Sequence, residues 1–353
     1  MPLRFRAPAE GDQQTPDLSK RAHLRFFVLA FPNNLYAAAF AAAFMVSWLT
    51  LPMWRSWAQR TGLVDDPGLR KIHTTPIPLA GGFAVFSGLL IPVLTGFAAV
   101  CMQWIPAGSL SPLTLGLQRR SIQLAAILCG ALGMLALGWI DDRHELSARH
   151  KFVGQCLIAT LVASSGLRIT LFVPSLLFSY AITILWILTL TNAFNFMDNM
   201  NGLCAGLAAI SALSFASAAA SRGQYLVTVI ALLACGSLVG FLPHNFPRAT
   251  AFLGDAGSHL SGFLMSILAI LPHFYSSKNP DIWAVLQPLF ILAVPLLDLV
   301  SVVVIRWRAG KPVYLGDNNH FSHRLTRCGF SKTSAVLWLW LLASAISALG
   351  LAL

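Results

Sequence analysis

Long apolar runs alternate with short polar segments along most of this chain, and this alternation limits the folds that are open to it. Of the 353 residues, 56% are hydrophobic and only 10% are charged, whereas a soluble globular domain carries about 25% charged residues. A water-soluble fold of this length needs more polar surface than the sequence supplies. We therefore predict an all-α, polytopic integral membrane protein.

About ten stretches are long and apolar enough to be transmembrane helices, for which about 20 mostly apolar residues are needed. They cover residues 35–54, 81–104, 121–140, 152–165, 176–191, 203–220, 224–242, 257–271, 282–305 and 333–353. The fourth and the eighth are short. Because we find no internal repeat, we expect a single transmembrane domain over residues 35–353, preceded by a flexible basic tail over residues 1–34.

The surplus of positive charge fits loops at a membrane surface. The formal net charge is +11, but the basic residues form no stripe interleaved with aromatic side chains, so we expect no nucleic-acid partner. When the amino terminus is placed outside, most loop Lys and Arg residues fall on one side, which is then the cytoplasmic side. The basic residues of the tail oppose this orientation, and the loops agree with one another.

Two further classes of feature are not expected. The six cysteines form no Cys-x-x-Cys pair and mostly fall in or beside apolar runs, so we predict neither a disulfide framework nor a zinc site. The first 25 residues are polar and charged and contain no apolar core of the kind that a cleavable signal peptide has, so no such peptide is expected.

Acidic residues are scarce, and most of the thirteen gather at span ends on the predicted cytoplasmic side. These are Asp65, Asp66, Asp141, Asp142, Glu145, Asp198, Asp255 and Asp317. Asp298 instead lies inside the ninth span, within about two helical turns of its inner end, from where it could reach the same side. Because a charge at the bilayer centre costs several kcal/mol, this distribution predicts a polar site at the cytoplasmic face.

Two of these span ends carry aspartates in a context that suits a metal ion or a phosphate. Asp141 and Asp142 close the third span, and adjacent carboxylates can bind a divalent cation or act separately as base and ligand. Asp255 follows Gly254 at the start of the eighth span, where glycines let backbone N–H groups approach an anion. The plainer alternatives are a solvated helix end for the Asp pair and a helix cap for Asp255.

Two polar segments complete the pattern. Asn192, Asn195, Asp198 and Asn201 recur every third residue, so they would share one face of a helix, and four such groups on one face suit a polar ligand better than a core. An Asn-rich turn is the alternative. In the last inner loop, His320, His323 and Arg324 lie close together; their side chains are natural partners of phosphate oxygens.

In this order along the chain, the segments resemble the polyprenyl-phosphate N-acetylaminosugar-1-phosphate transferases, which start the assembly of cell-envelope glycans. The resemblance runs from about Gly62 to Lys332 and begins with residues 62–82, which include Arg70-Lys71-Ile-His73. The Asp141-Asp142 pair, residues 192–203, residues 252–258 and the histidine loop follow. Each segment is a weak signal alone, but all five occur in order at inner span boundaries.

The resemblance implies a role for each matching position. Asp141 and Asp142 match an aspartate pair that handles the lipid phosphate close to the metal. Asp255 matches the metal-binding aspartate, and Asn195 matches an asparagine near the metal and pyrophosphate. The other matches are a further active-site acid, Asp198, the uracil-binding positions Asn245 and Phe252, and the phosphate-binding groups Lys71, His320, His323 and Arg324.

The chain departs from the family pattern in two motifs. The usual Asp-Gly-x-Asp-Gly-Leu reads Asp198-Asn199-Met200-Asn201-Gly202-Leu203, so Asn201 replaces an acid that contacts the nucleotide base. An amide offers a donor and an acceptor where a carboxylate only accepts. The usual His-x-His-His reads His320-Phe-Ser322-His323. Both departures concern substrate recognition, so they leave the sugar nucleotide open.

The resemblance implies an enzyme of the cell (inner) membrane. It would use Mg²⁺, or alternatively Mn²⁺, to transfer an N-acetylhexosamine 1-phosphate from a UDP-sugar to undecaprenyl or another polyprenyl phosphate, releasing UMP. N-acetylglucosamine is the expected sugar, because the run of three adjacent histidines of the muramoyl-pentapeptide branch is absent. That branch, a membrane transporter and an inactive scaffold remain the alternatives, and homodimerisation is left open.

Overall fold

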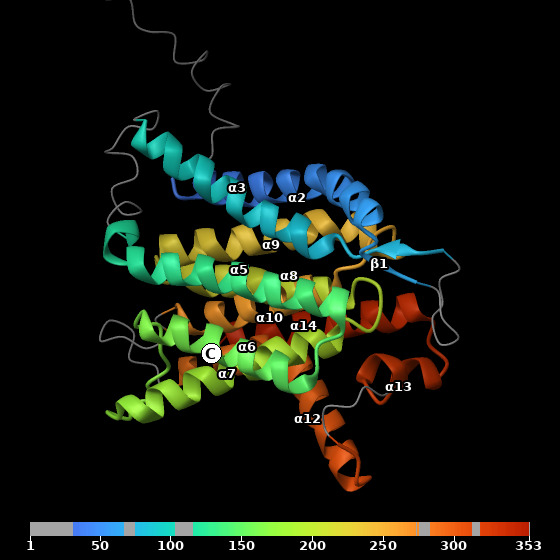
Figure 1. The fold of residues 1–353 in the computed structure, drawn as a ribbon. Helices are drawn as coiled ribbons and strands as arrows, with labels where there is room; N and C mark the ends of the chain where they lie inside the picture. Colours follow the sequence, from blue (N-terminus) through green and yellow to red (C-terminus); the bar gives the residue numbers. More distant parts are fainter. Residues whose placement is uncertain are drawn as a thin grey trace, which may run out of the picture.

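The computed structural model describes residues 31–66, 75–102, 116–272, 274, 283–312 and 318–352. Within these ranges the chain forms a helical bundle, in which most helices run side by side and α12 leaves the bundle at an angle (Figure 1). The helices are α2 (Asn33–Thr61), α3 (Gly81–Cys101), α5 (Ser121–His144), α6 (Ala148–Ser164), α7 (Leu176–Met197), α8 (Leu203–Ser221), α9 (Tyr225–Asn245), α10 (Gly254–Ile270), η2 (Trp283–Leu286), α11 (Gln287–Ile291), α12 (Ala293–Arg308), α13 (Phe321–Arg327) and α14 (Lys332–Leu351).

The all-α membrane architecture expected from the sequence is confirmed, whereas the count of ten spans is not. Seven described helices are long and apolar enough to cross a bilayer, and the number becomes eight if a bent pair counts as one span. That pair occupies the predicted ninth span, where the chain bends by 66° between residues 284–291 and 293–308. The predicted fourth and eighth spans are α6 and α10, with 17 residues each.

The outer faces of the helices are apolar, as the surface of a membrane protein should be. Large exposed hydrophobic side chains include Leu49, Leu157, Leu177 and Leu341, which lie on α2, α6, α7 and α14. In water such a surface would be unfavourable, but in a bilayer lipid tails cover it. The predicted tail falls almost entirely in residues 1–30, outside the described residues, and α2 begins at Asn33 rather than at residue 35.

Two glycines allow α9 to approach α2 closely. Gly236 and Gly240 lie one turn apart on α9 and face the α2 backbone, where an added Cβ would come within 2.3 Å of the Phe40 carbonyl oxygen and 2.4 Å of that of Phe44. Membrane helices approach closely through such small residues, because no hydrophobic effect drives their association.

A short hairpin anchors the loop between α2 and α3 beside the start of α10. Strands β1 (Val64–Asp65) and β2 (Ile77–Pro78) pair in antiparallel fashion. The Phe252 N–H donates to the Pro78 carbonyl oxygen at 3.0 Å, and the Gly81 N–H donates to the Phe252 carbonyl oxygen at 2.9 Å. The segments around residues 78–82 and 252–253 are therefore held together where α3 and α10 begin.

Candidate active site

The close packing of α5 on α10 brings two of the predicted acidic patches together. Gly138 lies one turn before the Asp pair, and a Cβ at this position would come within 2.2 Å of the Asp255 carbonyl oxygen. Only glycine leaves room for this approach. The end of α5, with Asp141 and Asp142, therefore lies directly against the first turn of α10, with Asp255.

Asp142 caps α10 from a neighbouring helix. Its Oδ1 accepts a hydrogen bond from the Asp255 N–H at 2.8 Å, and its Oδ2 accepts one from the Ala256 N–H at 3.0 Å. The first N–H groups of a helix have no partner within that helix, and a carboxylate there also interacts favourably with the helix dipole. Both oxygens of Asp142 thus stabilise the geometry of the site.

Asp141 has different surroundings, although it is the adjacent residue. Its Oδ1 accepts a hydrogen bond from the Leu146 N–H at 2.9 Å, and its Oδ2 forms an ion pair with the Lys151 ammonium group. The Lys151 Nζ also lies 3.5 Å from Asp255 Oδ2. Lys151 therefore joins the carboxylates of α5 and α10, and Asp141 keeps its second oxygen directed at this charged centre.

Asn195 connects α7 to the same centre. Its Nδ2 donates to Asp255 Oδ1 at 2.8 Å and to Ser258 Oγ at 3.0 Å. One turn earlier, Asn192 donates to Gln155 Oε1 of α6 at 2.8 Å. These two residues share a face of α7, as their spacing predicted.

The predicted shared face does not extend to Asn201. Helix α7 ends at Met197 and α8 begins at Leu203, so Asn201 lies in the turn between them. Its Nδ2 donates to the Pro247 carbonyl oxygen at 3.3 Å, which directs this amide toward the α9–α10 connection. The prediction was wrong for Asn201 because the three-residue period continues in the sequence beyond Met197, where the helix ends.

Asp198 lies at this helix end, next to the other carboxylates. Burial raises the pKa of Asp198 well above its ordinary value, and the negative charges of Asp255 and Asp142 raise it further. Asp198 also accepts a hydrogen bond from the Gly254 N–H at the start of α10, so it lies with the other carboxylates. We define the acidic centre as Asp141, Asp142, Asp198, Asp255, Asn195 and Lys151.

Asn245 and Phe252 border the connection between α9 and α10. The buried Asn245 side chain accepts a hydrogen bond from the Gly202 N–H at 2.6 Å and donates one to the Ala251 carbonyl oxygen at 2.9 Å. The oxygen and the nitrogen of this amide thus both bond to backbone groups, and Asn245 fixes the conformation of the α9–α10 connection. Phe252 is half-buried where that loop meets β2. Direct contact of either residue with a uracil stays a prediction.

A second group of residues surrounds α13. Asp298, buried within α12, accepts a hydrogen bond from the Phe321 N–H at 2.6 Å through Oδ1, and its Oδ2 lies 2.7 Å from His320 Nδ1. The same carboxylate therefore caps α13 and orients His320. The sequence suggested that Asp298 could reach the inner side, and the structure confirms that it contacts the histidine loop.

His323 and Arg324 lie on the next turn of α13. Burial lowers the pKa of His323, and the nearby His320 lowers it further. The Arg324 guanidinium lies 5.6 Å from the centre of the Phe321 ring. Arg324 is exposed, so its charge is accessible to an anionic ligand.

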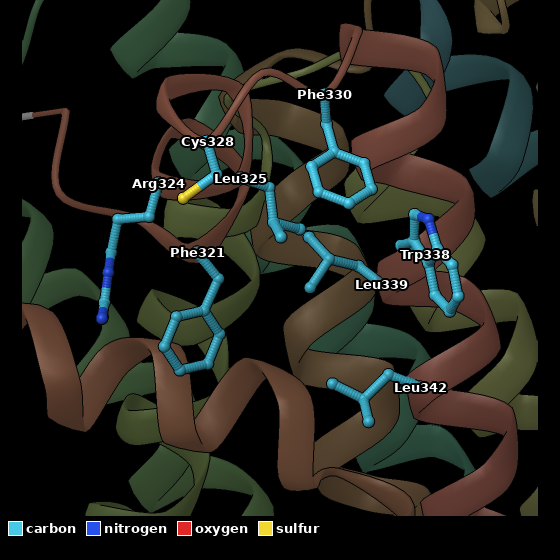
Figure 2. Close-up of a pocket in the computed structure, with 8 residues that line it drawn as sticks. All are labelled: Phe321, Arg324, Leu325, Cys328, Phe330, Trp338, Leu339 and Leu342. Carbon is cyan, nitrogen blue, oxygen red and sulfur yellow. The ribbon is translucent and has the colours of Figure 1, made fainter.

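Arg324 also borders an apolar groove between α13 and α14, with a volume of about 590 Å³. The groove is lined by Phe321, Arg324, Leu325, Cys328, Phe330, Trp338, Leu339 and Leu342. Figure 2 shows the Arg324 side chain at one side of the groove, while the apolar side chains lie between the two helices. The Arg324 guanidinium beside this apolar groove suits an amphiphilic ligand with an anionic head group.

Two residues named from the sequence lie outside the described residues, and one site residue was not predicted. Lys71 lies within residues 67–74, outside the described residues, as does Asp317 within residues 313–317. Lys151 was not recognised from the sequence as a site residue. A signal was present, because Arg149, His150 and Lys151 occupy the first turn of α6, where positive charge opposes the helix dipole unless an anion lies nearby.

The acidic centre has the chemistry of a site for a hard cation. Its candidate ligands, Asp141, Asp255 and Asn195, offer oxygen atoms, and the Lys151 ammonium group already lies between the two carboxylates. Within the described ranges, no three His, Cys, Asp or Glu side chains are arranged as ligands of one metal ion. Mg²⁺ is one such hard cation; it prefers oxygen ligands and needs only one or two carboxylates besides waters.

Comparison with known proteins finds similar chains over most of this sequence. The sequence model of glycosyl transferase family 4 matches residues 124–273. A probable undecaprenyl-phosphate N-acetylglucosaminyl 1-phosphate transferase of Bacillus subtilis is 33% identical over 85% of this chain and 81% of its own length. Decaprenyl-phosphate N-acetylglucosaminephosphotransferase of Mycobacterium tuberculosis is 33% identical over 88% and 80%. Undecaprenyl-phosphate alpha-N-acetylglucosaminyl 1-phosphate transferase of Escherichia coli K12 is 27% identical over 87% and 81%.

Proposed function

This chain belongs to glycosyl transferase family 4, and from that premise we propose that it transfers N-acetylglucosamine 1-phosphate from UDP-N-acetylglucosamine to a polyprenyl phosphate and releases UMP. The observation that carries the proposal is the acidic centre, where α5, α7 and α10 meet. The names of the three relatives favour N-acetylglucosamine over the muramoyl pentapeptide as the transferred group.

The reaction joins two anions, so positioning and charge neutralisation are its main requirements. An oxygen of the lipid phosphate attacks the β-phosphorus of the UDP-sugar. The new P–O bond forms as the bond between the β-phosphorus and the bridging oxygen breaks, and UMP leaves with the electron pair. A phosphate monoester is largely dianionic near neutral pH, its second pKa being about 6, so a strong base is not required.

The chain's own residues divide these tasks. Asp141, which contacts Lys151, positions the lipid phosphate and accepts its remaining proton. Lys151, His320, His323 and Arg324 offset negative charge on the phosphates. Asp142 and Asn195 hold the start of α10 and the Asp255 carboxylate in place. Mg²⁺, held by Asp255 with Asn195 and Asp141, would supply Lewis-acid stabilisation of the pyrophosphate.

The basic residues around the site support a cytoplasmic orientation. Arg143, Arg149 and Lys151 flank the connection between α5 and α6, next to the acidic centre. Such an excess of Lys and Arg is typical of cytoplasmic loops. The nucleotide would therefore reach the site from the cytosol, at the inner face of a bacterial inner membrane. The lipid would reach it from the bilayer.

A transfer assay with the purified protein tests this function directly. We expect UMP release and a polyprenyl-diphosphate-sugar product, identified by mass, only when Mg²⁺, polyprenyl phosphate and UDP-N-acetylglucosamine are all present. EDTA should abolish both signals, and an excess of Mg²⁺ should restore them. A panel of other UDP-sugars serves as the comparison. Uptake of labelled sugar into vesicles without any lipid product would contradict the proposal and favour a transporter.

The isoprenoid chain of the acceptor is expected to lie in the groove beside Arg324. Cys328 lines this groove and is exposed, so polyprenyl phosphate should slow its labelling by a maleimide. Cys101 is the control, because it is also exposed but is not among the residues that line the groove. It is the last residue of α3, about 30 Å by helix length from Gly81 at the other end of that helix. Equal labelling of Cys328 with and without the lipid would exclude this location.

A further inference from the structure

A hydrogen bond links α13 to the turn between α7 and α8. Ser322 Oγ donates to Asn199 Oδ1 at 2.6 Å. Ser322 is fully buried on α13, and Asn199 lies in the turn directly after Asp198. The bond therefore joins the helix that carries the histidines to the segment that carries Asp198.

Asn199 is itself held in place. Its Nδ2 donates to the Phe196 carbonyl oxygen at 2.6 Å, which fixes the direction of the side-chain oxygen. The Phe196 ring in turn lies 5.5 Å from the His320 ring, in an edge-to-face arrangement. One short stretch of chain thus contacts α13 through both an aromatic ring and a hydrogen bond.

The start of α13 is held by partners from two different elements. Asp298 holds the start of the helix through the Phe321 N–H and His320. The Asn199–Ser322 bond attaches the second residue of α13 to the turn after α7, so contacts from α12 and from the α7–α8 turn together set the orientation of this short helix.

Asn199 and Ser322 also lie in the two motifs in which this sequence departs from the pattern that it resembles: Asp-Gly-x-Asp-Gly-Leu has Gly at position 199, and His-x-His-His has His at position 322. The sequence alone gives no reason to connect these two positions, which lie 123 residues apart. The 2.6 Å contact shows that they meet. A larger side chain in place of the fully buried Ser322 would come into the space that Asn199 fills.

We propose that Asn199 and Ser322 are a coupled pair of positioning residues, which hold α13 in a fixed position relative to the acidic centre. The proposal rests on the proposed transferase function. The pair touches neither substrate nor metal; it sets where His323 and Arg324 lie relative to Asp198. The two departures then compensate each other and keep the enzyme active.

A double-mutant cycle tests the coupling. We expect Ser322→Ala and Asn199→Ala each to lower kcat about tenfold, as the loss of one buried hydrogen bond allows, with the KM for UDP-N-acetylglucosamine within about twofold. The double variant should also lose about tenfold rather than a hundredfold, because neighbouring residues that share one interaction are not additive. Ser322→Thr keeps the hydroxyl group and should retain most of the activity.

A matched control separates positioning from general stability. Ser211 is a buried serine whose hydroxyl bonds to the Ile291 carbonyl oxygen, away from α13. Ser211→Ala should lower the Tm without changing the kcat of the folded protein. If Ser322→Ala behaved in the same way, the pair would have only a structural role and the proposal would be wrong.

An exchange experiment gives the sharpest outcome. Ser322→His alone should lose most activity, because the imidazole has no room beside Asn199. Adding Asn199→Gly removes that side chain. The double variant should have a kcat at least tenfold higher than that of Ser322→His. Absence of restoration, or multiplicative effects in the cycle, would overturn the proposal. Non-additivity is also measured in Tm, so the contact can be tested even if the wild-type protein proves inactive as a transferase.

Discussion

Replacing Asp141 with asparagine is expected to lower the rate of sugar-phosphate transfer by about 10²–10⁴-fold, the range typical of losing a positioned acid–base group. The amide keeps the size of the side chain and one acceptor for the Leu146 N–H. It loses the charge that pairs with Lys151 and that positions the lipid phosphate. The measurement is UMP release at saturating substrates, together with Tm and chromatographic behaviour in detergent.

The adjacent aspartate provides an informative contrast. Asp142→Asn places an NH₂ group against the N–H donors of Asp255 and Ala256, and hydrogen bonds to a charged group are worth about 1.5–3 kcal/mol each. We therefore expect Asp142→Asn to lower the Tm clearly. Asp141→Asn should lower it less, because the amide still accepts from the Leu146 N–H and Asp255 still faces Lys151. Near-normal turnover of Asp141→Asn would remove this residue from the mechanism.

Replacing Asp255 with asparagine should have an effect of similar size, about 10²–10³-fold on kcat, as expected for losing electrostatic stabilisation at a phosphoryl centre. Asp255 accepts a hydrogen bond from Asn195 and faces Lys151 at 3.5 Å. Without its charge, Mg²⁺ should bind more weakly, so the concentration of Mg²⁺ that gives half-maximal activity should rise.

The Mg²⁺ titration distinguishes this cause from a simple loss of structure. Glu145→Gln is the matched control, because it removes one negative charge from an exposed position just beyond Asp141 and Asp142. We expect its activity and its Mg²⁺ dependence to stay within about twofold of the wild type, as exposed charges interact weakly. An unchanged Mg²⁺ requirement in Asp255→Asn would argue against Asp255 as a metal ligand.

Much of the candidate site could be predicted because the polar residues of a membrane protein are few. Asp141, Asp198, Asp255 and His320 stand out against apolar spans, and a buried charge without a partner is costly. The sequence could not assign different tasks to Asp141 and Asp142. Their difference depends on which carboxylate faces the first turn of α10, and that depends on how closely Gly138 lets two helices approach.

Other residues escaped prediction for related reasons. Lys151 reaches Asp141 and Asp255 across a helix interface, and a periodicity along one helix carries no information about its neighbours. The period through Asn192, Asn195 and Asp198 continued to Asn201 only in the sequence, because the helix ends at Met197. The bend in the predicted ninth span likewise occurs within a continuous apolar run.

The sequence by itself determined the class of this protein. Its apolar runs require helices, because every backbone polar group in a bilayer must be paired within the protein. Its few acids mark the span ends, where water can reach a charge. Only the tertiary structure decided which groups are in contact: Asp142 with the start of α10, Asp298 with His320, and Asn199 with Ser322. The physical reason is that hydrogen bonds and ion pairs act over about 3 Å, and contacts at that scale depend on helix packing rather than on spacing along the chain.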